Sequence, residues 1–285
     1  MSMVQNARKS IVLSLLLILS AISSPSWAHD YWIQPEQFRW GLGKPVKVHL
    51  FVGDHFKQGS ERPYQAKMTV SFHLIGAKGK RDIAKKLTEG VKPIATVQTH
   101  QAGSHLIAME RDWSRIELTA KKFNSYLEHE GLQAILKKRR LAGELKTVGR
   151  ERYRRYLKSL ITAEKADSAS SVYGQRLGHR LEIVPLSDPR RPGRSQSDSI
   201  RFQVWFDGKP LNDAQVEAYH RNGDQVKEQH GRTDKRGRVT FKIDRPGIWL
   251  VRLVHMQRCK DEKGIDWESF WSSYSFEVAS SSKSD

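Results

Sequence analysis

The sequence predicts a mostly β protein built from two antiparallel β-sandwich domains with an α-helical insertion between them. The second sandwich is expected to be a Greek key of transthyretin or immunoglobulin type. Two observations predict this. Short segments with strand composition alternate with turn residues over residues 29–118 and again over 199–278. Between these stretches, residues 119–166 place apolar residues at helical spacing. The chain has 285 residues, enough for two ordinary domains that each bury a core.

Residues 1–28 have the form of a signal peptide. Arg8 and Lys9 precede the apolar run 11–22, and the small residues Ser26 and Ala28 suit positions −3 and −1 of a cleavage site. The alternative is a membrane anchor, but a spanning helix needs roughly 20 apolar residues. We therefore expect cleavage after Ala28 and a periplasmic mature chain that begins at His29.

Residues 29–118 contain the first set of predicted strands. Residues 47–52 and 68–74 have strand composition and partial alternation, and 91–97 and 105–109 are similar. Glycines lie between these segments. Short strands separated by turn residues are typical of an antiparallel sandwich.

Residues 119–166 are predicted to form a basic helical insertion. Phe123, Tyr126 and Leu127 follow helical spacing, and so do apolar residues between Tyr153 and Ile161. This block has 13 Lys and Arg residues against 5 acidic ones. Two interpretations stay open: a surface for an anionic envelope component, or the solvated faces of helices that pack on a sheet.

The remaining segments complete the second β-domain. Residues 181–186 are expected to form a returning strand, and the Pro, Arg and Ser content of 187–197 indicates a linker, so that 167–198 connects the two units. Within 199–278, residues 200–206 alternate cleanly and are followed by a turn at Asp207–Gly208. Residues 279–285 are expected to be a disordered tail.

The net charge of +18 suggests nucleic acid at first sight. Removal of residues 1–28 lowers it to +16, and the block 119–166 carries +8 of that. For an exported chain we therefore expect no nucleic-acid partner. The single cysteine, Cys259, excludes an internal disulfide and a four-cysteine metal cluster. It is either a buried small side chain or one metal thiolate.

Eight segments of the chain resemble an exported bacterial family, the domain-of-unknown-function family numbered 4198. They are residues 28–35, 52–56, 123–132, 150–158, 181–189, 207–211, 247–256 and 266–271. The resemblance implies a periplasmic, β-rich, non-enzymatic protein associated with nickel and cobalt uptake. It implies a membrane transporter or an outer-membrane receptor of a metal-uptake system as partner. The dense basic block is not part of the usual family pattern.

His29 is the leading candidate for a metal ligand. After cleavage its α-amine and its imidazole Nδ1 can close a chelate ring on one ion, because an α-amine has a pKa near 7.7–8.0 and loses its proton readily to a metal. Amine and imidazole nitrogens suit Ni, Co and Cu. The alternative is that a histidine follows the cleavage site by chance.

A further ligand is needed to complete such a site. The sequence offers His255 at the end of an apolar strand, then His55 after a Gly-Asp turn, then Asp266 beside two tryptophans. For each, a hydrogen-bonded histidine or a turn-capping aspartate is an equal alternative. Met256 is more simply a packing residue.

The sequence gives no support to an enzyme. It has no Gly-x-Ser-x-Gly elbow, no phosphate-binding glycine loop and no His-Glu-x-x-His motif. The predicted function is an exported protein that binds a divalent transition metal ion (Ni or Co, with Cu as a further candidate) in metal uptake or homeostasis. The alternative is a periplasmic binding module without metal that holds a peptide, a glycan or an envelope surface.

Overall fold

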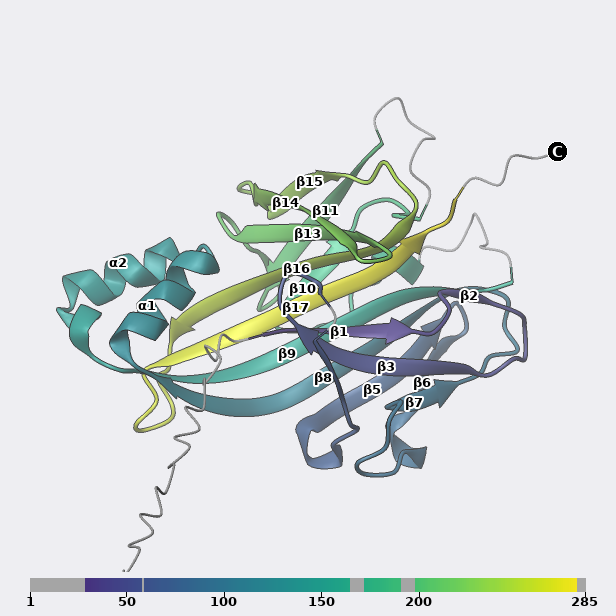
Figure 1. Ribbon diagram of the computed structural model, residues 1–285, viewed down its shortest axis with the longest axis horizontal. Coiled ribbons are helices and arrows are strands. Elements are labelled where there is room, and N and C mark those ends of the chain that lie inside the picture. The colour runs from purple at the N-terminus through teal and green to yellow at the C-terminus, as the bar shows by residue number, and fades with distance from the viewer. Residues whose placement is uncertain (1–28, 58, 165–171, 191–197, 281–285) are drawn as a thin grey trace, which may run out of the picture.

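The structure, a computed structural model, describes residues 29–57, 59–164, 172–190 and 198–280 (Figure 1). The predicted signal peptide, most of the predicted linker and the end of the predicted tail lie outside these residues. The protein is mostly β, as predicted, with two α-helices among the described residues. None of the helices in the described part is long and apolar enough to cross a membrane.

A nine-stranded sheet forms the centre of the fold and takes strands from both predicted β-units (Figure 1). Eight of its strands lie in the order β14 (Gln225–Arg232), β13 (Gln215–Asn222), β16 (Gly247–Arg258), β17 (Trp267–Val278), β9 (Gly149–Ala163), β8 (Gly103–Leu118), β5 (Thr69–Gly76) and β6 (Gly79–Asp82). The ninth, β2 (Arg39–Trp40), pairs with the end of β9. β17 pairs with β9 in parallel and β9 pairs with β8 in antiparallel, so strands from both predicted β-units belong to one hydrogen-bonded sheet.

Two smaller sheets pack on the central one. The first contains β1 (Asp30–Pro35), β3 (Val46–Gly53), β4 (Ser60–Arg62) and β7 (Ala95–Val97). The second contains β10 (Leu181–Pro185), which is the predicted returning strand, with β11 (Ser199–Phe206), β12 (Lys209–Pro210) and β15 (Arg238–Lys242). Short 3-10 segments lie at Ala66–Met68, Ala84–Lys86, Glu144–Lys146 and Val172–Gly174.

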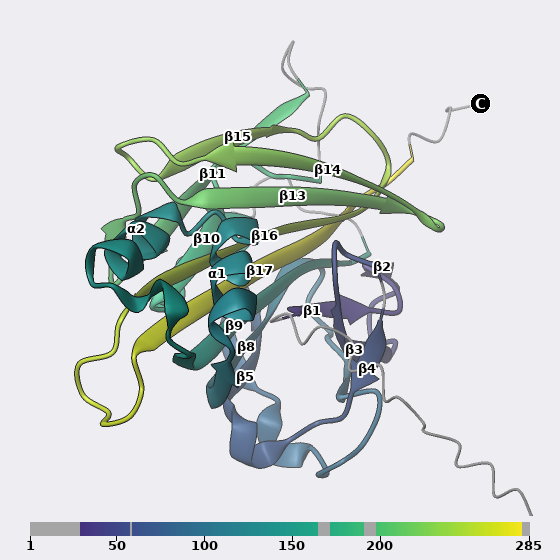
Figure 2. The same ribbon diagram turned by 60° about the vertical axis from the view of Figure 1, so that its left-hand side comes forward.

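Both faces of the central sheet are covered. Along β9, Tyr156 and Leu160 belong to the core under the second small sheet, whereas Leu157 and Ile161 belong to the core under the first. Because successive side chains of a strand point to opposite faces, the two small sheets lie on opposite faces of the central sheet. Figure 2 shows this arrangement from the side.

The helices α1 (Ala120–His129) and α2 (Gln133–Leu141) cover one end of the central sheet, on the face that also carries the first small sheet (Figure 2). Phe123, Tyr126 and Leu127 are buried in one core with Val254 and Trp267 of β16 and β17. Helical spacing therefore predicted α1 correctly, since these residues form a single apolar stripe that packs on the sheet.

The second half of the predicted helical insertion is a strand. Residues 149–163 form β9, which lies between β17 and β8 in the middle of the central sheet. The prediction was wrong because a strand buried on both faces has no apolar–polar alternation. Its apolar residues then match a helical spacing by coincidence.

Candidate functional site

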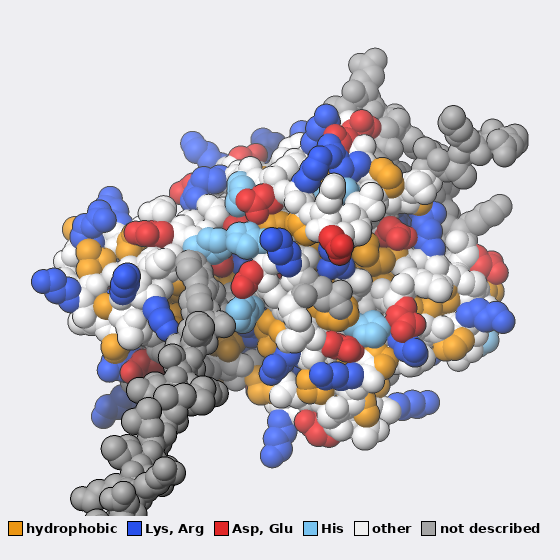
Figure 3. All heavy atoms as spheres, in the orientation of Figure 1, with side chains coloured by type: hydrophobic (Ala, Val, Ile, Leu, Met, Phe, Trp, Pro, Cys, Tyr) orange, Lys and Arg blue, Asp and Glu red, His pale blue; other side chains and the backbone are white. Residues whose placement is uncertain are grey.

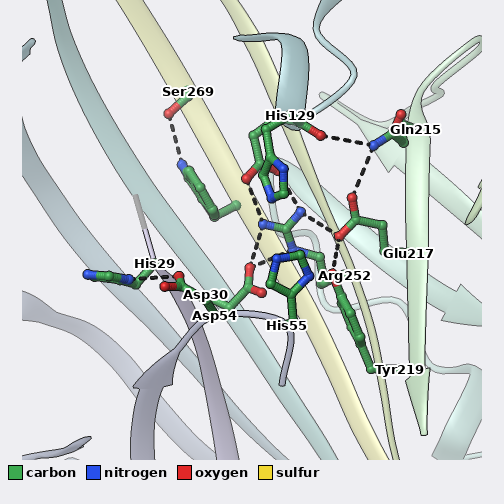
Figure 4. A network of polar contacts seen from close by, with 12 residues as sticks. His29, Asp30, Asp54, His55, His129, Gln215, Glu217, Tyr219, Arg252 and Ser269 are labelled. Carbon is green, nitrogen blue, oxygen red and sulfur yellow. Dashed lines mark hydrogen bonds and ion pairs between the residues drawn. The ribbon is translucent and has the colours of Figure 1, made fainter. Parts of the chain in front are cut away.

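Four charged side chains form a buried cluster where four elements meet. The Arg252 guanidinium donates through Nε to Asp30 Oδ1 at 2.6 Å, and through Nη1 to Glu130 Oε2 at 2.5 Å and Glu217 Oε2 at 3.0 Å. None of the four residues is more than 6% exposed. Figure 4 shows Arg252 at the centre, with Asp30 and Glu217 on either side.

The local sequence explains how each member reaches this point. Glu217 of β13 pairs directly opposite Arg252 of β16. Glu130 follows the last residue of α1, where Gly131 adopts φ +64°. The Gly131 N–H bonds to the Glu128 carbonyl and the Leu132 N–H to the Leu127 carbonyl. This Schellman motif ends the helix and holds Glu130 against the sheet.

Three carboxyl groups face one guanidinium, so the cluster has a surplus of acid. Burial raises the pKa of Glu130 to about 7 and also raises the pKa of Asp30, although Arg252 acts to lower both. Burial also acts on Glu217, but Arg252 and hydrogen bonds from Tyr219 and Gln215 lower its pKa. The electrostatic consequence is a local preference for a further positive charge.

Histidines surround this cluster at the surface. The His55 and His129 rings meet edge to face with centroids 5.3 Å apart, and His55 Nδ1 lies 3.3 Å from Glu228 Oε2. His230 Nδ1 lies 3.7 Å from Glu217 Oε1. Figure 3 shows histidine side chains gathered in the middle of this face of the molecule. Burial lowers the pKa of His129, which favours the neutral imidazole that binds metals.

The loop after β3 presents His55. His55 and Phe56 both adopt positive φ, 50° and 57°, a conformation that costs energy for residues other than glycine. Phe56 is fully buried, and its ring lies 5.2 Å from that of Trp32. A Cβ on Gly53 would lie 2.0 Å from the Lys57 carbonyl oxygen, so only glycine fits there. The packing of Phe56 offsets this backbone strain and fixes His55 at the rim of the buried cluster, the surface region where the histidines lie.

His29 lies on the other side of the same loop. Its Nδ1 is 2.7 Å from Asp54 Oδ1, and the next residue, Asp30, is held by Arg252. Asp30 also pairs with Gly53 at the start of β1. The predicted mature terminus is thus fixed by a strand and a buried ion pair. In Figure 4 the His29 ring points away from His55.

The family comparison is consistent with the sequence resemblance. The family model "Domain of unknown function (DUF4198)" matches residues 26–257, which include all four members of the charged cluster. The chain belongs to this family. The description of the DUF4198 family assigns no function.

Other comparisons add little for this DUF4198 protein. No curated protein matches it. Among solved structures it is similar to a DUF4785 family protein from Legionella pneumophila (10% identity, 77% of this chain, 50% of that chain, TM-score 0.21). It is also similar to three N-terminal domains of the outer capsid protein Hoc of bacteriophage RB49 (11% identity, 87% and 59% coverage, TM-score 0.20). The chain thus spans about half the length of these two structures.

Two of the four predicted metal ligands lie elsewhere in this DUF4198 protein. His255 is inside β16, not at its end, and the centroid of its ring lies 4.3 Å from that of Phe206 in the second small sheet, with the two rings tilted by 55°. It therefore lies on the opposite face of the central sheet from Met256 and Arg252. Burial lowers its pKa to about 4. The strand continues past His255 because β17 pairs with β16 as far as Arg258.

Asp266 lies at the far end of the β16–β17 pair. It accepts a hydrogen bond from the Arg150 backbone N–H at 3.1 Å, and its Oδ2 is 3.7 Å from Arg150 Nη1. Arg258 of β16 pairs with Trp267, the residue after Asp266. Arg258 lies six residues along β16 from Arg252, which is roughly 20 Å at strand spacing. Neither His255 nor Asp266 is therefore placed to share an ion with His29.

A second group of possible metal ligands lies beside Cys259. Its sulfur and one oxygen each of Asp261 and Glu268 lie within 4.8 Å of one another, the one such group of three among the described residues. The Arg152 guanidinium already occupies it, since Arg152 Nη2 donates to Asp261 at 2.6 Å and also to Glu268. A cation would have to displace this positive charge, so this group is a poor metal site.

The structure adds residues that the sequence did not single out. His129 and His230 have no metal-ligand spacing in the sequence, yet they lie at the rim of the cluster. A signal was present for some of the others, because Asp30, Glu130 and Arg252 each lie in a family-like segment. Glu217 lies in none and is identified only by its pairing opposite Arg252.

A neighbouring buried carboxyl group of this DUF4198 protein gives a pH prediction. Burial raises the pKa of Glu151 to about 7, although hydrogen bonds from Ser269 and Tyr126 oppose the shift. The native state then binds more protons than the unfolded state between about pH 4.5 and 7, so this group's stabilising contribution is lost as pH rises through that range. In Glu151→Gln this loss is absent.

The measurement is urea unfolding of both proteins at pH 5.5 and 8.5. From the lower to the higher pH, wild type is expected to lose about 1–3 kcal/mol relative to Glu151→Gln. Any constant cost of the glutamine amide cancels in this comparison. Glu117→Gln, at a mostly exposed carboxylate paired with Arg150, serves as the control and should show no such change. If the difference in unfolding free energy between wild type and Glu151→Gln were the same at pH 5.5 and pH 8.5, the prediction would be contradicted.

Proposed function

We propose that this protein is an exported, non-enzymatic carrier of a divalent transition metal ion, Ni, Co or Cu, in metal uptake or homeostasis. The ligands we propose are His29, His55 and His129. The observation that carries the proposal is the contact of His55 with His129 above a buried cluster in which three carboxyl groups face one arginine. A membrane transporter or an outer-membrane receptor is the proposed partner, and the periplasm the proposed location.

The chemistry of the rim supports a metal ion. Imidazole nitrogens suit Ni, Co and Cu, and the lowered pKa of His129 keeps its imidazole unprotonated near neutral pH. The carboxylates beneath the histidines provide the negative field that favours a cation. The side chains of His29 and His55 are 42% and 45% exposed, so both have room to turn toward a shared ion.

The predicted mature terminus supplies the remaining proposed ligand, His29. Cleavage after Ala28 leaves the α-amine on His29, the residue that precedes the Arg252-bound Asp30. This anchoring removes much of the chain entropy that a free terminus loses on binding. The amine and Nδ1 of His29 would chelate the ion, with Asp54 released from Nδ1.

Titration of the exported, processed protein with Ni²⁺, Co²⁺ and Cu²⁺ tests the proposal. His55→Ala and His129→Ala are expected to weaken binding at least about tenfold, or about 1.4 kcal/mol. His100→Ala, at an exposed histidine beside Gly43, should leave binding unchanged. An extra Met before His29 should weaken binding by a similar factor, because it removes the chelating amine. Equal binding by all variants would contradict the proposed site.

One further observation favours the alternative, a binding module that docks on an anionic envelope surface. The helices expose Lys121, Lys122, Lys137, Lys138 and Arg140. Leu141, at the end of α2, is 79% exposed beside them. An apolar side chain among cations suits an anionic lipid surface. This docking predicts that binding to anionic vesicles weakens as salt rises, and salt-independent binding would contradict it.

A further inference from the structure

A second charged site lies on the same face of the central sheet, and its charges are positive. Arg111 of β8 and Arg155 of β9 pair directly opposite each other. Both side chains are buried, each with 6% exposure. Like charges directly opposite on neighbouring strands repel, so this pair costs free energy unless something compensates it.

No carboxylate of the described residues forms an ion pair with either arginine. Arg111 Nη2 donates to Gln65 Oε1 at 2.7 Å, while Arg111 Nη1 and Arg155 Nε are buried without a hydrogen-bond partner in the described structure. Glu151 of the same strand interacts electrostatically with Arg155 but forms no ion pair with it. Glu151 Oε1 accepts hydrogen bonds from Tyr126 and Ser269, and its Oε2 is buried without a hydrogen-bond partner in the described structure. Arg62, close enough to act on Arg111, adds a third positive charge.

The other deeply buried arginines among the described residues have carboxylate or backbone carbonyl partners. Arg252 binds three carboxylates, Arg152 binds Glu268 and Asp261, and Arg190 binds Asp188. Arg139 donates to two backbone carbonyls. Since a buried charge without a partner is costly, the exception at Arg111 and Arg155 indicates a site whose anion comes from outside the chain.

The pair is surrounded by apolar side chains and by two tyrosine rings. Met109 and Leu157 belong to the core under the first small sheet, whereas Ile116 and Tyr153 pack with the helical core. The two arginines lie between these cores. Tyr31 covers Arg155 with its ring centroid 4.0 Å from the guanidinium carbon, and Tyr153 lies 4.5 Å from the same carbon. Both tyrosines are partly exposed.

We propose that Arg111 and Arg155 bind the oxyanion group, a carboxylate or a phosphate, of a small ligand, with Tyr31 and Tyr153 as its aromatic walls. Guanidinium groups match the geometry of both oxyanions, and the aromatic rings hold the arginines in place by cation–π contact. The site is independent of the proposed metal ligands, since it uses none of them.

Isothermal titration with sodium phosphate and, separately, with sodium succinate tests this site at constant ionic strength. The wild-type protein is expected to bind at least one probe saturably. Arg155→Gln and Arg111→Gln are expected to weaken that binding at least about tenfold. Arg154→Gln is the matched control, because Arg154 is the next residue on β9 and already pairs with Asp112 and Glu110 on the opposite face.

The outcomes separate a ligand site from a purely structural stack. Comparing the affinity for phosphate with that for succinate shows which oxyanion the site binds. Equal binding by wild type and both glutamine variants, or no binding of either probe by wild type, would overturn the proposal. Circular dichroism checks that each variant is folded, and Arg111→Lys, which keeps the charge but not the fork, should weaken binding if Arg111→Gln does not fold.

Discussion

Replacing Arg252 by methionine is expected to lower the free energy of unfolding by about 3–5 kcal/mol at pH 8. The substitution keeps most of the side-chain volume but removes the one cation that faces Asp30, Glu130 and Glu217. Three buried carboxyl groups then have to be protonated or stay ionised without a partner. Urea unfolding monitored by tryptophan fluorescence measures the change.

The pH dependence of this loss is a second part of the same prediction. Without Arg252 the pKa values of the three carboxyl groups rise further, so the variant binds protons in its folded state that the unfolded chain releases. The variant therefore loses stability as pH rises above about 4, the ordinary carboxyl pKa, and its deficit is smaller at pH 5 than at pH 8.

Arg258→Met provides the matched control for Arg252→Met. Arg258 lies on the same strand and binds Glu144, but its side chain is 36% exposed. A surface pair of this kind contributes at most about 1 kcal/mol. Equal losses of unfolding free energy in Arg252→Met and Arg258→Met would contradict the prediction, because the buried cluster would then contribute no more than a surface ion pair.

Replacing Lys158 by methionine is expected to cost a similar amount, about 3–5 kcal/mol. Lys158 Nζ donates to Glu182 Oε1 at 2.5 Å, and the two side chains are 2% and 0% exposed. Burial lowers the pKa of Lys158 despite Glu182. The pKa of Glu182 is also lowered, because Lys158 and the backbone N–H of Leu177 outweigh the effect of burial. Removing the lysine leaves a buried carboxylate with no cation.

A double-mutant cycle separates the pair from its surroundings. Lys158→Met combined with Glu182→Gln should recover at least half of the loss, because glutamine keeps an oxygen for the Leu177 N–H at 2.6 Å and carries no charge. In wild type, the stabilising effect of Glu182 is present above its unfolded pKa near 4.3 and lost as pH falls through its lower folded value. A double mutant no more stable than Lys158→Met would contradict this account.

These buried pairs show where sequence prediction stops. The segments 29–118 and 199–278 were correctly predicted to be rich in strands, and α1 was correctly placed, because apolar periodicity records which face of an element is buried. The same signal failed for residues 149–163. That strand is covered on both faces, and its apolar residues show no alternation.

The residues of the candidate site were likewise predicted only in part. The sequence by itself predicted His29 and His55 as metal ligands, and it contained Asp30, Glu130 and Arg252 within family-like segments. It did not determine that His129 lies against His55, since 74 positions separate them in the sequence. It also placed His255 in the same site, although pleating turns that side chain to the opposite face.

What only the tertiary structure decided is which charges share a buried space. Pairing of β13 with β16 brings Glu217 to Arg252, and pairing of β8 with β9 brings Arg111 to Arg155, where no carboxylate of the described residues forms an ion pair with either. A local pattern records burial, which depends on one residue's own surroundings. Charge pairing depends on two residues far apart in the chain, and their distance is fixed only when the strands take their register.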